Sequence, residues 1–245
     1  MRIIDPRIYV EQYDGIKIMK NIESACRTCY RSENLISEDS YKKLLRNCIT
    51  RGHESVLEHE KITIKMICDI GVYKDLTRHR FGSFSIESTR YCNYGKDKFD
   101  NKIKFIKPVF YTPGTIESYT DVTDKTNCLK TQYWVRCMEI IEEHYMDMLK
   151  NTKATPDELR MILPHSTAAQ VTMTANIREW KHILDLRTKQ MTHPSIQQLL
   201  IPLLLKFKED MPDIFESIDY NTNFDSNKYA KLEVCKDWTE LNNAV

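Results

Sequence analysis

The sequence predicts an α+β fold, a single domain with long helices packed around an antiparallel or mixed β-sheet. Three observations predict it. Apolar residues recur at helical spacing in several long segments, and strand-like alternation appears between them. At 245 residues the chain is near the upper size for one hydrophobic core. Hydrophobic residues make up 41% and charged residues 29%, as in an ordinary globular protein.

The first half of the chain alternates between the two patterns. Apolar residues at helical spacing predict a helix over Ile16–Tyr30 and another over Tyr41–Arg51, which Gly52 ends. Alternation predicts a half-buried strand over Ile62–Cys68. A short helix over Val72–His79 should follow, and a second strand over 102–110 should end at the turn-rich residues 112–114.

The second half is mainly helical. A helix is expected over 126–151, with one apolar stripe formed by Leu129, Tyr133, Cys137, Ile140, Ile141, His144 and Met148. A helix over Asp157–Leu163 should end at Pro164, and β-branched residues predict a strand over Thr167–Thr174. Two more helices are expected over Asn176–Arg187 and Pro194–Asp210, the second kinked at Pro202. The polar residues 221–245 lack periodicity, so we expect a domain over 1–220 and a loosely attached tail.

Charge and apolar runs narrow the class of protein. Lys and Arg number 36 against 35 Asp and Glu, so the basic excess that is typical of nucleic-acid binders is missing. The most apolar run, Leu199–Leu205, is too short to cross a bilayer and contains Pro202. No apolar leader precedes Tyr13. The expectation is a soluble, cytoplasmic protein that binds neither membrane nor nucleic acid.

Cysteine and glycine usage narrows the chemistry. Eight cysteines are scattered without a secretory signal, which favours free thiols. Cys26 and Cys29 form a Cys-x-x-Cys pair, but no second pair or histidine pair at ligand spacing follows, so we interpret them as small residues on a helix face. The six glycines include no Gly-x-Gly turn. A bound nucleotide must therefore be held by side chains, and arginine suits phosphate best.

The segment from Arg78 to Tyr91 stands out chemically. It contains three arginines and three serines but a single acidic residue, Glu87. Such an array offers many hydrogen-bond donors and few acceptors, which suits an anionic, oxygen-rich ligand. Interleaved aromatic residues indicate a partly buried site where a flat ring could stack. Gly82 is expected to provide a sharp turn between the basic and hydroxyl parts.

This segment resembles the signature of flavin-dependent thymidylate synthases. The family motif is Arg-His-Arg, seven residues, then Ser, and Arg78-His79-Arg80 with Ser88 satisfies it. The longer form ends in Ser-x-Arg-Tyr, as Ser88-Thr89-Arg90-Tyr91 does. The segments His53–His59, Arg160–Pro164 and Asn176–Arg187 are also similar to family segments. Ser85-Ile86 stands where many members carry Asn-Glu, and Asp75 stands where Gln or Glu is usual.

The resemblance implies an activity. Such an enzyme methylates dUMP to dTMP, with methylenetetrahydrofolate as carbon donor, reduced FAD as hydride source and NADPH as reductant. It also implies a homotetramer with sites at subunit interfaces. The implied cofactor-binding residues are Ser55, Arg78, His79, Arg80, Asn176, Arg178 and His182. The implied substrate-binding residues are Asp75, Arg78, Glu87, Ser88, Thr89, Arg90, Arg160 and Arg187.

Within that set, Arg187 is the expected catalytic residue, because a permanent cation can stabilise negative charge developing on the pyrimidine. Arg90 and Arg160 are expected to clamp the phosphate. His144 and His165 have no motif context and are expected to be structural or surface residues.

Three rival interpretations remain open. The first is a related flavin-dependent enzyme that modifies C5 of a different pyrimidine nucleotide or adds a different carbon unit. The second is a non-catalytic nucleic-acid-binding protein that uses Arg78 to Arg90 as a basic loop. The third is a redox or zinc protein built on Cys26 and Cys29.

Overall fold

A computed structural model describes residues 1–110 and 125–236, with the side chains of 125–128 excluded. Its strands are β1 (Arg2–Ile4), β2 (Arg7–Glu11), β3 (Lys61–Asp69), β4 (Gly82–Ile86), β5 (Lys104–Ile106), β6 (Ala168–Asn176) and β7 (Lys231–Cys235). Its helices are α1 (Gly15–Thr28), α2 (Ser40–Thr50), α3 (Ile70–Leu76), α4 (Lys125–Thr152), α5 (Pro156–Leu159), α6 (Ile177–Arg187), α7 (Pro194–Asp210) and α8 (Pro212–Phe215). Short 3₁₀ helices include η2 (Glu54–His59) and η5 (Arg160–Ile162).

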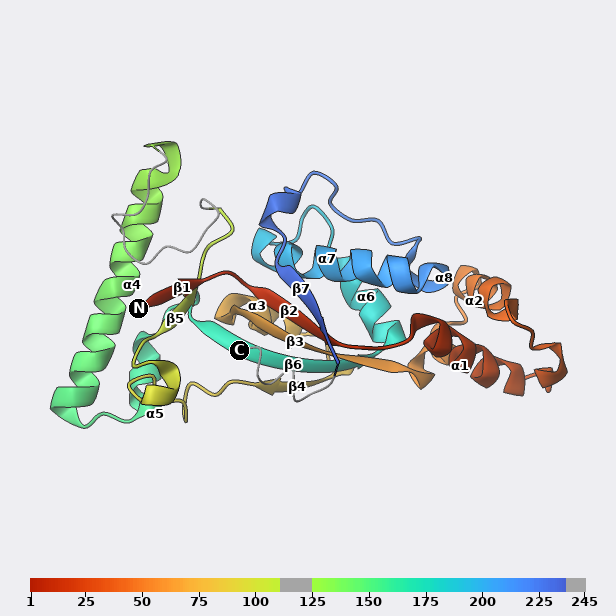
Figure 1. The fold of residues 1–245 in the computed structure, drawn as a ribbon, viewed down its shortest axis with the longest axis horizontal. Coiled ribbons are helices and arrows are strands. Elements are labelled where there is room, and N and C mark those ends of the chain that lie inside the picture. The colour runs from red at the N-terminus through yellow and green to blue at the C-terminus, as the bar shows by residue number, and fades with distance from the viewer. Residues whose placement is uncertain (111–124, 237–245) are drawn as a thin grey trace. The chain divides into compact units, whose positions relative to one another are not determined.

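A mixed five-stranded sheet organises these elements (Figure 1). Its strand order is β4-β6-β3-β2-β7, and a separate pair joins β1 to β5 in parallel. The predicted α+β class is confirmed. The predicted helices and strands are found within a few residues of their expected bounds, although β5 is shorter than expected and the turn at 112–114 lies outside the described residues.

The chain divides into two compact units, each of which is described by itself. Unit 1 contains residues 1–7, 66–76 and 85–171, and unit 2 contains 8–65, 77–84 and 172–245, as far as they are described. The division passes through β3 and β6, so both strands contribute to both units. The predicted domain boundary after residue 220 stays a prediction.

The core of unit 2 contains aromatic contacts between side chains of α6, α7 and α8. The rings of Trp180 and Phe207 meet edge to face with centroids 6.2 Å apart, and Phe215 packs 5.1 Å from Phe207. The Trp180 indole N–H donates to the Ile62 carbonyl at 2.9 Å, which satisfies the polar group of a fully buried ring. α7 continues through Pro202 with most of its side chains buried, whereas the predicted kink stays a prediction.

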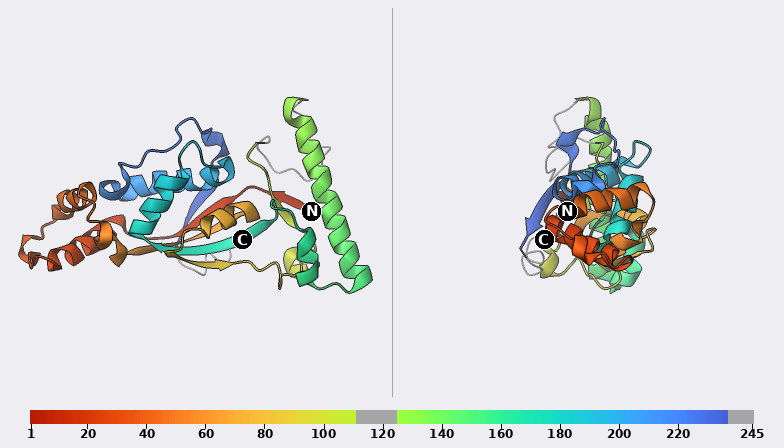
Figure 2. Two further views of the ribbon diagram at one scale, coloured as in Figure 1. Left: turned by 180° about the vertical axis from the view of Figure 1, so that it is seen from behind. Right: turned by 90° about the vertical axis from the view of Figure 1, so that its right-hand side faces the viewer.

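Helices α1 and α2 also belong to unit 2 and lie side by side in both views of Figure 2. Cys26 of α1 is buried with its Sγ 3.7 Å from Sγ of Cys48 on α2, while Cys29 is exposed. The cysteines of the described part are free, as predicted, and that part contains no cluster of three or more metal-ligating side chains.

The predicted apolar stripe of α4 is wrong about which face is buried. Leu129 and Tyr133 are 60% and 68% exposed. The buried face is instead formed by Thr131, Val135, Met138 and Tyr145. Apolar residues occupy two faces of this helix, and periodicity alone could not tell which one packs on unit 1.

One strand prediction needs a further correction, and the position of Gly82 can be given in more detail. β3 was predicted to be half-buried, but Lys65 and Ile67 on its second face are buried too, and β3 is the middle strand of the five-stranded sheet. Gly82 closes the turn that follows the Arg78-His79-Arg80 segment, where its N–H donates to the His79 carbonyl at 3.4 Å, and it is also the first residue of β4. A Cβ there would lie 2.9 Å from Cε of Met173 on β6, so a larger residue would require that methionine side chain to shift.

The expected loose tail is also wrong for the part that the structure describes. Residues 231–235 form β7, the edge strand beside β2. The N–H of Gln12 donates to the Cys235 carbonyl at 2.7 Å, and Cys235 is buried. Residues 237–245 lie outside the described residues. None of the described helices combines the length and apolarity needed to cross a bilayer.

Candidate functional site

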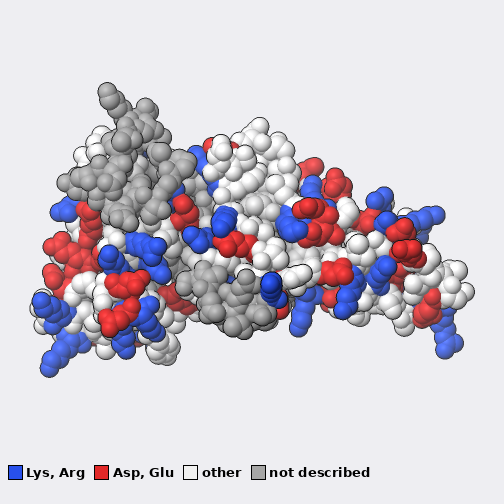
Figure 3. Space-filling model, in the orientation of Figure 1, with Lys and Arg blue, Asp and Glu red and all other residues white. Residues whose placement is uncertain are grey.

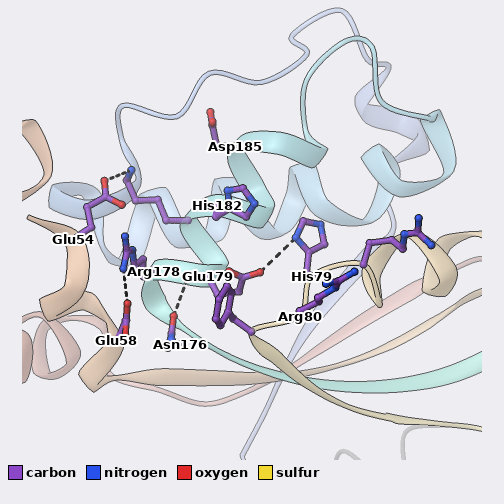
Figure 4. A pocket seen from close by; sticks show the side chains of 12 residues that line it. Glu54, Glu58, His79, Arg80, Asn176, Arg178, Glu179, His182 and Asp185 are labelled. Atoms are coloured by element: carbon purple, nitrogen blue, oxygen red, sulfur yellow. Dashed lines mark hydrogen bonds and ion pairs between the residues drawn. The ribbon is translucent and has the colours of Figure 1, made fainter. Parts of the chain in front are cut away.

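A pocket of about 650 Å³ opens in unit 2 (Figure 4). Its size is within the range of small-molecule and cofactor sites. Three segments form its walls: η2, the turn that precedes β4, and one face of α6. The residues that line it are Glu54, Glu58, Arg78, His79, Arg80, Phe81, Asn176, Arg178, Glu179, Lys181, His182 and Asp185.

Helical periodicity explains how α6 contributes to the pocket. Arg178, His182 and Asp185 follow one another at spacings of four and three residues, so they share one face. Trp180 and Ile183 lie on the opposite side in the core of unit 2. An amphipathic helix therefore holds polar groups against the pocket while its buried face fixes their position.

Two ion pairs join α6 to η2. Nη1 of Arg178 lies 2.6 Å from Oε1 of Glu58, and Nζ of Lys181 lies 2.8 Å from Oε1 of Glu54, as the dashed lines of Figure 4 show. These cations are already neutralised by protein carboxylates. The exposed side chains of Arg78 and Arg80, by contrast, form no ion pair within the described part of the chain. The positive charge available for an anionic ligand is therefore concentrated on Arg78 and Arg80.

A buried network lies behind these arginines. His79 is only 5% exposed, and its Nε2 accepts a hydrogen bond from Nε of Arg187 at 3.0 Å. Its Nδ1 faces Oε1 of Glu179 at 3.5 Å. The ring of His182 meets the His79 ring edge to face, with centroids 5.7 Å apart. Burial raises the pKa of Glu179, while the nearby His182 and Arg178 act in the opposite direction.

The pocket thus brings together most of the predicted cofactor-binding residues, namely Arg78, His79, Arg80, Asn176, Arg178 and His182. Ser55 instead lines a second hollow of about 490 Å³ in unit 2, together with His53, Cys48 and Arg51. Arg187 reaches the pocket wall through its bond to His79. Their roles stay predictions, but one cavity joins six of these residues.

Sequence reasoning missed several lining residues. Phe81 is 81% exposed beside the arginines, and Glu54, Glu58, Glu179 and Lys181 also line the cavity. A signal existed for the ion pairs, because Glu54 and Glu58 are four residues apart on one segment. Their basic partners are three apart on α6, but only the fold could show that the two segments face each other.

The predicted phosphate clamp is in unit 1. Nε of Arg90 lies 3.0 Å from Oδ1 of Asp157, and Nη1 of Arg160 lies 3.8 Å from the same oxygen. Ser88 Oγ accepts the Arg90 N–H at 3.3 Å, so the hydroxyl stays close to this pair. The two arginines thus face one carboxylate oxygen, and their role as a phosphate clamp stays a prediction.

The remaining predicted substrate residues of unit 1 are placed as follows. The Glu87 carboxylate accepts the Gln170 N–H at 3.3 Å and the Tyr94 hydroxyl at 3.2 Å. Burial raises the pKa of Glu87 although these bonds oppose the shift. In the structure Glu87 therefore accepts hydrogen bonds from the protein itself, one of them from the backbone of β6. Asp75 lies half-buried on α3 and Thr89 half-buried in the turn after β4, and substrate contacts for all three stay predictions.

Asn176 has a second role at the start of α6, and this yields a prediction. Its Oδ1 accepts the Glu179 N–H at 2.8 Å as the helix N-cap. Asn176→Ala is expected to cost about 1 kcal/mol of stability in urea unfolding, because the N–H loses its acceptor. Asn176→Ser restores an N-cap oxygen without the amide NH₂ and should restore that stability. If both variants were equally destabilised, the cap would not be what Asn176 contributes.

A known protein family matches the part of the chain that forms the pocket. The family model described as Thy1, thymidylate synthase complementing protein, matches residues 16–213. The chain belongs to this family. The match covers η2, the turn that contains Arg78 and the whole of α6, so all three walls of the pocket lie inside it.

Curated relatives of this Thy1 chain carry a more specific name. A flavin-dependent thymidylate synthase from Mycobacteroides abscessus is 27% identical over 85% of this chain and 83% of its own length. Another from Pseudothermotoga lettingae is 27% identical over 75% of this chain and 78% of its own.

Solved structures share the fold of the Thy1 chain. Thymidylate synthase X (ThyX) from Helicobacter pylori, crystallised with FAD and dUMP, has a TM-score of 0.65 at 19% identity, covering 87% of this chain and 98% of that one. The UMP/dUMP methylase PolB from Streptomyces cacaoi, bound with 5-Br dUMP, has a TM-score of 0.70 at 22% identity, covering 88% and 96%. At these identities the likeness shows the fold alone.

Proposed function

We propose that this Thy1 chain is a flavin-dependent thymidylate synthase that converts dUMP to dTMP. The methylene group comes from methylenetetrahydrofolate and the hydride from reduced FAD. One observation carries the proposal. The Arg-His-Arg segment meets α6 in a single cavity, and Arg187 is bound to its central histidine at 3.0 Å.

The chemistry of the pocket fits FAD. Arg78 and Arg80 are free of ion pairs within the described part and match a diphosphate, which is dianionic. Phe81 offers an exposed aromatic face of the kind on which a flat ring stacks. When bound, reduced FAD supplies the hydride, and the protein provides placement and charge.

Four further predicted cofactor residues have more specific tasks. Arg178 is held by Glu58, so it presents fixed N–H donors rather than free charge. Asn176 keeps its amide NH₂ available because only its oxygen caps α6. His182 lies exposed beside His79 and can donate to the cofactor, and Ser55 contributes a hydroxyl from its own hollow.

The substrate phosphate is proposed to be held by Arg90 and Arg160. Asp157 occupies their donors in the free protein, and a phosphate offers more oxygens and more charge than one carboxylate. Phosphate thus displaces Asp157 from the arginines, and Ser88 and Thr89 add hydroxyl donors. Arg187 provides a permanent cation for the negative charge that develops on the pyrimidine.

Finer features of the proposal are NADPH as reductant, a cytoplasmic location and assembly into a homotetramer. The exposed face of α4 supports assembly. Leu129, Tyr133 and Ile140 present apolar side chains to solvent along that helix, which is typical of a surface that another subunit covers. Size-exclusion chromatography with light scattering would measure the number of subunits.

The nucleic-acid-binding alternative is less well supported. Formal net charge is +1, and the face drawn in Figure 3 carries basic and acidic side chains interspersed rather than in a continuous basic band. Phosphate-backbone binding depends on a surplus of cations along such a band. The pocket residues also include four acids, which disfavour a polyanion.

The experiment that tests this function is product analysis of the purified enzyme with FAD, NADPH and methylenetetrahydrofolate. Separate reactions contain dUMP, UMP or dCMP. We expect a yellow protein whose flavin absorbance bleaches with NADPH and which forms dTMP from dUMP. A methylated product from UMP or dCMP only would support the rival C5-modifying enzyme. A colourless protein that binds no added FAD, but binds DNA or RNA in a salt-sensitive way, would contradict the proposal.

A further inference from the structure

We propose that Glu179 is a positioning residue that acts through His79 to hold the guanidinium of Arg187 in place. This inference rests on the proposed function, because it assigns Arg187 the charge-stabilising role. Glu179 lies within the family-like segment Asn176–Arg187, but neither the sequence nor the resemblance assigns it a role. Figure 4 shows its carboxylate directed at His79 in the pocket wall.

The hydrogen bond between Arg187 and His79 defines the protonation of the imidazole. A guanidinium donates hydrogen bonds and accepts none, so Nε2 of His79 must carry a lone pair to accept from Nε of Arg187 at 3.0 Å. In a neutral imidazole the proton then sits on Nδ1. A proton on both nitrogens would remove the acceptor and place two cations against each other.

The carboxylate of Glu179 selects this tautomer. Its Oε1 lies 3.5 Å from Nδ1 of His79, so an oxygen acceptor faces that nitrogen and favours the Nδ1–H form. The Glu179 side chain is almost fully buried, so solvent screens the attraction little. Glu179 therefore places a carboxylate oxygen opposite Nδ1 of His79 and helps to orient the ring.

The backbone around Glu179 is itself fixed. The residue is in the first turn of α6, where its N–H is capped by Asn176 at 2.8 Å. A negative charge at this end of a helix is stabilised by the helix dipole. The charged and titratable groups that act on its carboxylate include Arg178 and His182 on α6 and His79 from the turn before β4. The chain of contacts therefore runs from a rigid helix start, through a buried imidazole, to Arg187.

Loss of the Glu179 carboxylate would weaken the contacts that hold His79 and Arg187 in place. Without the carboxylate, His79 can also adopt the tautomer with its proton on Nε2. In that tautomer the Nε2–H of His79 faces the Nε–H of Arg187, and two donors cannot form a hydrogen bond. Arg187 would lose the hydrogen bond of its Nε to His79, and with it the orientation that this bond imposes, while remaining charged. The expected consequence is slower turnover with unchanged substrate affinity, since an interaction needed mainly in the transition state is misaligned.

The test compares Glu179→Leu with its matched control Glu179→Gln, whose amide oxygen can still accept from Nδ1–H. For Glu179→Leu we expect kcat to fall roughly 10-fold to 100-fold, with KM for dUMP within about threefold and FAD content unchanged. Glu179→Gln should retain most of the activity. Wild-type kcat in Glu179→Leu, or equal losses in both variants, would overturn the inference.

A second readout does not depend on turnover. Solid-state NMR of enzyme labelled with nitrogen-15 in its seven histidines reports the tautomer of each ring, and the His79 signal is assigned from its loss in His79→Gln. We expect Nδ1–H in wild type and Glu179→Gln, and a substantial Nε2–H population in Glu179→Leu. An Nε2–H wild-type ring would refute the inference. An enzyme with the expected tautomers but no dTMP formation would refute the proposed function instead.

Discussion

An Arg187→Ala enzyme is expected to fold, to bind FAD and to form dTMP roughly 10²-fold to 10³-fold more slowly than wild type. The guanidinium is the group proposed to stabilise charge on the pyrimidine, and alanine removes both that charge and the bond to His79. Because the side chain is only partly buried at the end of α6, its removal leaves no large cavity. Single-turnover rates with pre-reduced enzyme measure this step without interference from flavin reduction.

Arg187→Lys is the matched control for charge. Lysine keeps the cation but not the planar guanidinium that binds His79, so partial activity between wild type and alanine is expected. Flavin absorbance and the thermal midpoint should stay near wild-type values in both variants. Full dTMP formation by Arg187→Ala would contradict the catalytic role.

The second large effect concerns the substrate phosphate. Arg90→Ala and Arg160→Ala are each expected to lower kcat/KM for dUMP roughly 10-fold to 100-fold, mainly through KM. Both guanidinium groups now point at Asp157, at 3.0 and 3.8 Å, and phosphate is proposed to take that position. Steady-state kinetics with varied dUMP give the two parameters separately.

Deoxyuridine separates phosphate binding from other defects, because it lacks the phosphate. Its slow turnover should be the same in wild type and in both arginine variants. Asp157→Asn serves as the opposite control: it removes the competing charge, so KM for dUMP should stay equal or decrease. Unchanged KM in Arg90→Ala, or an equal loss with deoxyuridine, would show that these arginines do not hold the phosphate.

Most of the fold was predictable because local signals and tertiary packing agree. The helix that begins after Asn176 has an N-cap residue, an amphipathic pattern and a clear end, and it forms over Ile177–Arg187. Pro194 at the first position of α7 likewise marks its start. In both helices the sequence pattern and the buried face coincide.

The errors arise where local pattern and packing conflict. In α4 two faces carry apolar residues. The exposed face has the more regular apolar pattern, so the sequence predicts the wrong face to be buried. Strand β7 lies in a polar segment whose pairing partner, β2, is more than two hundred residues away, so no local pattern predicts it. Strand stability there depends on cross-strand pairing rather than on its own composition.

The residues of the candidate site likewise fall into those that the sequence predicts and those that only the structure shows. The Arg78–Arg80 motif and α6 could be assigned to one ligand from sequence, and the structure places both around one pocket. The acidic partners could not be assigned, because Glu54, Glu58 and Glu179 matter only through what they face. Residues that orient other residues leave little trace in a one-dimensional pattern.

The most direct test of the central claim is one turnover of FAD-loaded enzyme that has been reduced without oxygen and freed of NADPH. Adding dUMP and methylenetetrahydrofolate should return the flavin absorbance to its oxidised form while one dTMP forms per flavin. That stoichiometry would show that the flavin provides the reducing equivalents for methylation. A flavin that stays reduced, or that reoxidises without dTMP, would contradict the account.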